Sequence, residues 1–210
     1  MEKICVIFGA GEYYGCERLP SESFSVVTAD GGYAAAVKAG VAPEIHIGDF
    51  DSYSGPEIAG CEVVRLRPEK DFSDTHNAAL LAVERGAREL LFLGCTGGRT
   101  AHTVSNIQTM AYFAARGIRV RMTGNRETFA CIHNGSIRFA AASTGYVSAF
   151  ALTDECAGVT ETGLKYEIAE HTLKNDLPQG LSNEFKGESA EISVRDGALL
   201  VIYGEGGIEE

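Results

Sequence analysis

Short apolar segments that each end in glycine or aspartate recur through residues 1–126, and they constrain the fold more than any other feature. Ile4–Phe8, Phe24–Ala29 and Ile45–Gly48 are the first three, and each has the length of a buried strand. An alanine-rich helical pattern at 33–39 follows the second. Such alternation is typical of β-α-β units, which form mostly parallel sheets and bind ligands beyond the carboxyl ends of their strands. We therefore predict an α/β domain over residues 1–126.

Two longer helical patterns support this prediction. The first opens at 70–76, after a strand near 62–66, and the second follows a strand near 88–94. The apolar sides of these helices are expected to carry Leu80, Val83 and Ala87 in the first, and Val104, Ile107, Ala111 and Ala114 in the second. A further strand is expected at 118–122.

Five aspartates follow these strands or precede these helices. Asp49 and Asp51 are separated by one residue, so both can point the same way from an extended backbone. Asp71 and Asp74 lie three residues apart where a helix opens, and Asp30 follows a strand. Helix capping or solvation would explain each group alone. Five carboxylates at successive strand ends would repel one another, however, so we predict a bound cation, and their oxygens suit Mg²⁺.

Gly97-Gly98-Arg99 precedes the second long helix and forms a candidate phosphate-binding loop. Two glycines, an arginine and the free N–H groups of a helix start can together hold a phosphate. His102 and Asn106 follow one turn apart on one helix face. They could orient a ligand or merely form internal hydrogen bonds, and the sequence leaves both explanations open.

The glycines between 9 and 15 suggest a dinucleotide-binding loop, and Asp30 lies about where such a fold places a ribose-binding acid. We reject this interpretation because the third glycine is out of register. The segment 12–20 also lacks the apolar periodicity of the helix that should receive a pyrophosphate. A glycine-rich segment near a ligand is all that this stretch supports.

Charge and cysteine usage exclude several functional classes. The net charge of −11 argues against a broad surface for nucleic acid or anionic membranes. No apolar run has membrane-spanning length, and the first strand begins at Ile4 without a signal-peptide pattern, so a cytoplasmic protein is expected. The six cysteines are scattered without zinc-site spacing, and we expect them to be reduced and structural.

From residue 127 onward the helical periodicity disappears, and short strands alternate with turn signals. Asn134-Gly135 and Asp196-Gly197 each stand between apolar alternating runs, a pattern that predicts β-hairpins. We therefore predict a second domain over residues 127–210 that is built of antiparallel strands.

Taken together, several segments resemble the thiamine pyrophosphokinase (thiamine diphosphokinase) family. Those in the first half are Ala29–Gly32, Gly48–Ser52, Lys70–Asp74 and Gly97–His102 with Asn106-Ile107, and those in the second half are Gly163–Tyr166 and Ser182–Phe185. Each segment is weak alone, but six in this order are specific. The resemblance implies an α/β catalytic domain, a β-sandwich-like domain, and a homodimer that binds thiamine at the subunit junction. The implied reaction transfers a pyrophosphoryl group from ATP to the thiamine hydroxyl and releases AMP.

The resemblance also assigns roles to individual residues. Asp49, Asp51 and Asp74 match the Mg²⁺-binding carboxylates, with Asp30 and Asp71 close by. Further matching residues are Lys70 and Arg99 toward phosphates, His102 and Asn106 beside them, and Ser182 and Asn183 toward thiamine. Clustered carboxylates agree with the chemistry, because phosphoryl transfer requires positioning and charge neutralisation. Asp71 or Asp30 could accept the proton of the alcohol, and the choice stays open.

Two positions depart from the family pattern. Ser73 replaces a threonine and keeps its hydroxyl, whereas Ala101 stands where the family has an aspartate. Loss of a carboxylate favours two alternatives, a slow or altered kinase and a degenerate sensor that binds thiamine or its diphosphate. Asp49 and Asp51 also suggest an aspartyl-phosphate phosphatase, although the residues around Ser52 fit that motif poorly. Release of AMP separates these hypotheses.

Overall fold

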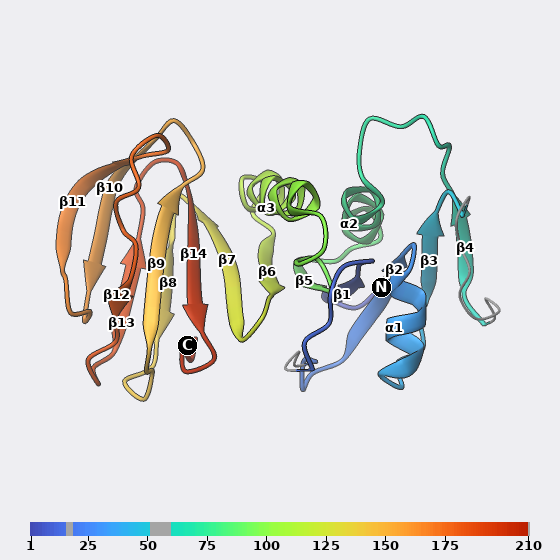
Figure 1. Cartoon of the computed structure of the whole chain (residues 1–210), viewed down its shortest axis with the longest axis horizontal. Helices are drawn as coiled ribbons and strands as arrows, with labels where there is room; N and C mark the ends of the chain where they lie inside the picture. Colours follow the sequence, from blue (N-terminus) through green and yellow to red (C-terminus); the bar gives the residue numbers. More distant parts are fainter. Residues whose placement is uncertain (16–18, 51–59, 210) are drawn as a thin grey trace. The chain divides into compact units, whose positions relative to one another are not determined.

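The computed structural model describes residues 1–15, 19–50 and 60–209, and these divide into two compact units (Figure 1). The first unit comprises Met1–Thr109 with Met122–Asn125, and the second comprises Met110–Arg121 with Arg126–Glu210. An α/β region with mostly parallel strands precedes an antiparallel β region, as the sequence predicts. Helix α3 (Thr100–Ala114) and strand β6 (Arg119–Thr123) each contribute to both units, and the boundary at residue 126 stays a prediction.

Five parallel strands of the first unit are neighbours in a sheet, in the order β5-β1-β2-β3-β4. They are β1 (Ile4–Phe8), β2 (Phe24–Ala29), β3 (Ile45–Gly48), β4 (Glu62–Arg65) and β5 (Glu89–Leu93). Every residue of β1 and β5 is buried, which explains why β1, and β5 after Glu89, are continuously apolar rather than alternating. Parallel pairing brings the carboxyl ends of the strands to one edge, where the glycines and aspartates follow.

The buried faces of the helices agree only in part with the prediction, which holds for Ala87 and Ala114. Helix α1 (Gly32–Lys38) is short, and α2 (Asp74–Glu84) buries Ala78, Ala79 and Ala82 fully, whereas Leu80 and Val83 are only half-buried. In α3 the side chains of Met110 and Phe113 are buried, and Val104 is 51% exposed, so its predicted place on the apolar side was wrong. Within the described ranges, no helix combines the length and the apolar character needed to cross a membrane.

Two antiparallel sheets face each other in the second unit and form a β-sandwich. One has the order β12-β9-β14-β7 and the other β11-β10-β13-β8. Their bounds are β7 (Glu127–His133), β8 (Ser136–Phe139), β9 (Tyr146–Ala151), β10 (Glu155–Thr162), β11 (Ile168–Lys174), β12 (Asn183–Glu184), β13 (Ala190–Ser193) and β14 (Ala198–Gly204). Buried side chains from both sheets, including Val147, Leu199, Phe139 and Ile192, pack into one core.

The two predicted hairpins are instead connections between the sheets. Strand β7 pairs with β14 and β8 pairs with β13, so the turn at Asn134-Gly135 leads from one sheet to the other. The turn at Asp196-Gly197 does the same between β13 and β14. These turns support each other, because the Gly197 N–H donates to Asn134 Oδ1 at 2.8 Å and the Asn134 N–H donates to the Gly197 carbonyl at 3.2 Å. A local turn signal does not reveal which sheet receives the next strand.

Candidate functional site

A cavity of about 500 Å³ lies at the carboxyl ends of the parallel strands in the first unit. It is lined by Ala10 and Gly11 after β1, Ala29 and Asp30 at the end of β2, Gly94–Arg99 after β5, Ser73–Thr75 at the start of α2, and His102 and Asn106 of α3. Residues from three of the segments that the sequence analysis singled out, Ala29–Gly32, Lys70–Asp74 and Gly97–His102 with Asn106, therefore meet at one place.

Two carboxylates converge beside this cavity on one ammonium group. Lys70 Nζ lies 2.8 Å from Asp74 Oδ1 and 3.1 Å from Asp49 Oδ2. Asp74 opens α2, where the positive end of the helix dipole favours a carboxylate, and the Ser73 hydroxyl caps the same helix by accepting from the His76 N–H. The lysine shows that the space between Asp49 and Asp74 suits a cation.

Asp30 is the most perturbed carboxyl group of this cluster. Burial, a hydrogen bond with Asp74 and the negative charges of Asp74 and Asp49 raise its pKa to about 7, although Lys70 opposes the shift. Its backbone adopts φ of 48°, and its Oδ1 lies where a Cβ on Gly48 would approach within 2.4 Å. The glycine that ends β3 thus leaves room for a carboxylate from the neighbouring strand end.

The predicted phosphate-binding loop faces the same cavity. Gly97 and Gly98 have φ of 77° and 57°, values that only glycine adopts readily. The Gly98 N–H donates to Glu12 Oε1 at 2.9 Å, and the exposed Arg99 follows. A backbone N–H that holds a carboxylate can hold a phosphate oxygen equally well, so Glu12 occupies a position that suits an anionic ligand.

The glycines after β1 allow close packing against the loop that follows β5. The Gly9 N–H donates to the Leu93 carbonyl and the Gly11 N–H to the Gly94 carbonyl, so this segment continues alongside the loop after β5. A Cβ on Gly11 would lie 2.6 Å from the Thr96 carbonyl oxygen. No helix follows within the described part of 9–20, in agreement with the rejection of a dinucleotide-binding loop.

Asn106 and His102 lie on the wall of the cavity with different surroundings. Asn106 is buried, and its Nδ2 donates to the Cys95 carbonyl at 2.7 Å, so it fixes the loop that carries the glycines. His102 is exposed and faces the cavity without such a role. Of the two explanations that the sequence left open, the internal hydrogen bond holds for Asn106, and ligand orientation by His102 stays a prediction.

Two threonines of the cavity wall were missed by the sequence analysis. The Thr96 hydroxyl is buried, and within the described ranges it has no hydrogen-bond partner, although it lines the cavity together with Thr75. Buried hydroxyls without partners are uncommon, which marks Thr96 as a candidate ligand contact. Single threonines carry no recognisable signal in the sequence.

Other predicted residues lie away from the cavity or outside the described residues. Asp71 is exposed and is not part of the lining, whereas Asp51 falls in the segment 51–59, outside the described residues. Across 1–15, 19–50 and 60–209, no three histidine, cysteine or acidic side chains form a group that could hold a metal ion. The predicted ligand set of Asp49, Asp51 and Asp74 stays a prediction.

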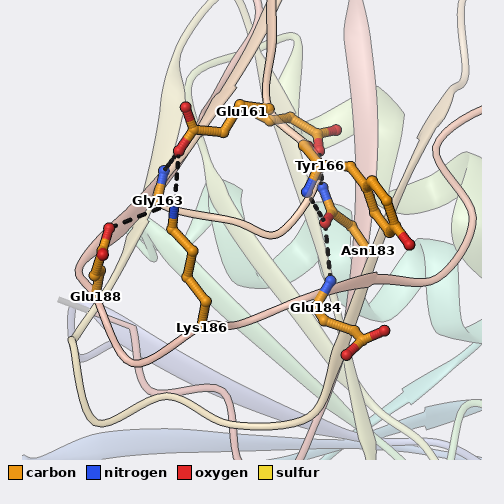
Figure 2. Close-up of polar contacts among 8 residues, drawn as sticks. Glu161, Gly163, Tyr166, Asn183, Glu184, Lys186 and Glu188 are labelled. Carbon is orange, nitrogen blue, oxygen red and sulfur yellow. Dashed lines mark hydrogen bonds and ion pairs between the residues drawn. The ribbon is translucent and has the colours of Figure 1, made fainter.

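Ser182 and Asn183 lie in the second unit, at the start of β12. Ser182 is exposed with φ of 60°, and its N–H donates to the Ser148 hydroxyl. Asn183 is 6% exposed and makes hydrogen bonds to Glu161, Tyr166 and Glu184 (Figure 2). The serine is therefore accessible to a ligand, whereas the asparagine belongs to an internal network.

Comparison with known proteins finds two family matches that follow the two regions. Residues 16–122 match the family described as "Thiamin pyrophosphokinase, catalytic domain", and residues 136–199 match "Thiamin pyrophosphokinase, vitamin B1 binding domain". The thiamine pyrophosphokinase of Bacillus subtilis is 25% identical over 179 residues, which cover 82% of this chain and 84% of that protein.

Solved structures agree in fold over nearly the whole chain. The crystal structure of the Bacillus subtilis thiamine pyrophosphokinase superposes with a TM-score of 0.82 at 23% identity and covers 96% of this chain and 99% of its own. That of thiamin pyrophosphokinase from Geobacillus thermodenitrificans gives a TM-score of 0.78 at 27% identity, covering 96% and 97%. Apart from Ala10 and Gly11, the residues of the cavity and its acidic cluster lie in the range 16–122 that matches the catalytic family.

Proposed function

Because the chain belongs to the thiamine pyrophosphokinase family, we propose that the strand-end cavity of the first unit binds ATP with Mg²⁺ for pyrophosphoryl transfer to thiamine. Members of this family are ATP-dependent enzymes, and the activity of this chain is that of a thiamine pyrophosphokinase. The observation that carries the site assignment is the convergence of Asp30, Asp49 and Asp74 beside a glycine loop.

The donor set fits Mg²⁺. Asp49 and Asp74 supply hard carboxylate oxygens, and Asp51 follows closely in sequence. Lys70 already places a positive charge between the first two, and Asp30 and Asp74 approach closely enough to share a hydrogen bond. When bound, Mg²⁺ would neutralise the charge that develops on the phosphates of ATP.

The triphosphate is proposed to lie along Gly97-Gly98-Arg99. The backbone N–H groups and the Arg99 guanidinium suit phosphate oxygens, and a phosphate would displace the Glu12 carboxylate from Gly98. Lys70, which lies beside Asp49 and Asp74, would supply a positive charge to the phosphates. Thr96 offers a hydroxyl to the same ligand.

In the reaction the thiamine hydroxyl oxygen forms a bond with the β-phosphorus of ATP, and the bond from that phosphorus to the α,β-bridging oxygen breaks to release AMP. The alcohol proton needs an acceptor near the reacting phosphorus. Asp30 is better placed than Asp71, because Asp30 lines the cavity and Asp71 is exposed outside it. In a loose transition state this proton transfer can come late, so the acceptor needs position more than basicity.

Thiamine is proposed to bind beside Ser182 of the second unit, at the junction of a homodimer. The match of residues 136–199 to a vitamin B1 binding domain supports this assignment, and Ser182 is exposed there. Light scattering tests the dimer, and a monomeric mass at assay concentration would contradict it.

The test of the proposed function is identification of the nucleotide product. The protein is incubated with ATP, Mg²⁺ and thiamine, and the products are separated by chromatography. We expect AMP and thiamine diphosphate in equal amounts, with no AMP when thiamine or Mg²⁺ is omitted. Tight thiamine binding without AMP would indicate the sensor alternative, and phosphate or ADP as product would contradict pyrophosphoryl transfer.

A further inference from the structure

We propose that Asn183 is a positioning residue that, supported by the buried carboxylate of Glu161, fixes the loop 163–167 beside the thiamine site. This inference rests on the proposed function for the identity of the ligand. It does not make Asn183 a ligand contact. Figure 2 shows its side chain directed toward Glu161 and Tyr166.

Every hydrogen-bonding position of the Asn183 amide is occupied. Its Oδ1 accepts from the Tyr166 N–H at 3.0 Å and the Glu184 N–H at 2.9 Å. Its Nδ2 donates to Glu161 Oε2 and to the Tyr166 carbonyl, both at 2.7 Å. An asparagine amide has two donors and about two acceptor positions, so none is left for a ligand. The partners also fix the amide orientation, because a flipped amide would place donors against donors.

Glu161 restricts the orientation of the Asn183 amide, because it is a buried carboxyl group that accepts one of the amide's hydrogen bonds. It lies on β10, is 4% exposed, and burial raises its pKa. The hydrogen bond from Asn183 opposes this shift, because it stabilises the charged form. A buried carboxyl group requires hydrogen-bond donors, and the Asn183 amide supplies one at short distance. Glu161 therefore favours one orientation of Asn183, and Asn183 in turn holds the loop.

The loop that Asn183 holds carries an accessible aromatic ring. Tyr166 is 60% exposed, although both its N–H and its carbonyl are bonded to the buried amide. A second attachment comes from the Lys165 N–H, which donates to the Glu184 carbonyl. Ser182 precedes Asn183 directly, so one buried side chain controls the backbone of Tyr166 next to an exposed hydroxyl residue. An exposed aromatic face suits a cationic heterocycle such as thiamine.

The experiment reverses the polarity of the buried hydrogen bond. N183D keeps the acceptor for the two N–H groups but places a second carboxylate oxygen against Glu161 and the Tyr166 carbonyl. We expect the KM for thiamine to rise at least about tenfold, while the KM for ATP stays within about twofold, in keeping with the loss of a buried polar contact. In N183D/E161Q the glutamine amide can donate to the introduced carboxylate, so the thiamine KM should recover substantially.

N134A is the matched control. Asn134 makes a comparable side-chain bond to a backbone N–H, at a sheet connection of the same unit. This variant should lose thermal stability without a change in the thiamine KM. An unchanged thiamine KM in N183D, an equal rise in N134A, or no recovery in the double variant would overturn the positioning role.

Amide hydrogen exchange separates this inference from the proposed function. Exchange at residues 163–167 should accelerate in N183D and slow again in the double variant, whether or not the protein turns over thiamine. A wild-type protein that releases no AMP would remove the proposed function while leaving this test intact. Unchanged exchange at 163–167 in N183D would overturn the inference even in an active enzyme.

Discussion

The two polar clusters of this protein are built on opposite principles. In the first unit, Asp49 and Asp74 pair with Lys70, and burial, a hydrogen bond with Asp74 and the negative charges of Asp74 and Asp49 raise the pKa of Asp30 to about 7. In the second unit, the Asn183 amide meets two donors and two acceptors at ordinary distances. In the first cluster, like-charged carboxylates lie close together. In the second, every donor and acceptor of the amide has a partner within the protein.

The difference indicates what each cluster does. Carboxyl groups with shifted pKa values at a cavity are typical of functional sites, where a cation or a substrate can neutralise their charge. A saturated buried network instead fixes one backbone conformation. Substitutions in the first cluster should therefore reduce turnover without lowering the stability of the fold. Substitutions in the second cluster should lower stability and raise the KM for thiamine together.

The largest expected effect comes from Asp74→Asn. Removal of this carboxylate takes away a proposed metal ligand, and we expect kcat/KM to fall by about 10²–10³-fold, as for other groups that stabilise transition-state charge. The melting temperature without Mg²⁺ should change little, because relief of the repulsion with Asp30 offsets the loss of the ion pair with Lys70. Glu84→Gln, at the other end of α2, is the control and should keep full activity. A clearly lower melting temperature in D74N would contradict the proposed difference between the acidic cluster and the Asn183 network.

Ala101→Asp tests whether the acidic cluster of the first unit lacks a carboxylate that catalysis needs. Ala101 is exposed in the first turn of α3, where a carboxylate is favoured by the helix dipole. Restoring the aspartate of the family pattern should raise kcat/KM by about tenfold, a part of what one transition-state contact can supply. Steady-state assays with saturating ATP provide the measurement. An unchanged rate would show that another group already performs this task.

Asp30→Asn should stabilise the protein by an amount that depends on pH, because the pKa of Asp30 is raised in the folded protein. The folded pKa of about 7 lies above the ordinary value of 3.8, so the proton stabilises the fold fully below pH 3.8, and this contribution is lost as the pH rises through 7. The gain in melting temperature from D30N, measured without Mg²⁺, should therefore be larger at pH 8 than at pH 5. The same gain at both pH values would argue against a strained carboxyl group.

Glu12→Gln should have the smallest effect, on nucleotide affinity alone. The Glu12 carboxylate holds the Gly98 N–H and must leave before a phosphate can bind. Replacing it by a neutral amide removes a competing charge at an exposed position, so the KM for ATP should fall by about two- to threefold. The thiamine KM should not change. A rise in the ATP KM would show that Glu12 supports the loop and does not compete with the ligand.

The sequence predicts the first cluster better than the second because the relevant signals are local. Strand ends, glycines and paired aspartates are short-range patterns, and parallel pairing then brings Asp30 and Asp49 together without further information. What local patterns miss is orientation. Asp71 and Asp74 look equivalent at a helix start, yet only Asp74 reaches Lys70 and the cavity.

In the second unit the missing information is long-range. Asn134-Gly135 predicts a turn correctly, but pairing of β7 with β14 is decided by a strand more than 60 residues away. Likewise, Ser182-Asn183 resembles a ligand-binding motif, and the role of Asn183 becomes visible only through Glu161, 22 residues earlier in the chain. Thr96 escapes sequence analysis for the same reason, because its buried, unpartnered hydroxyl is a property of packing.

The most direct test of the account is the location of the metal ion. Crystals grown with Mn²⁺ and a non-hydrolysable ATP analogue, measured at the manganese absorption edge, would reveal the ion by anomalous scattering. We expect an anomalous peak within coordination distance of carboxylate oxygens of both Asp49 and Asp74, with Lys70 displaced from between them. A peak bound to neither aspartate would contradict the claim that the strand-end carboxylates hold the metal and thereby the nucleotide.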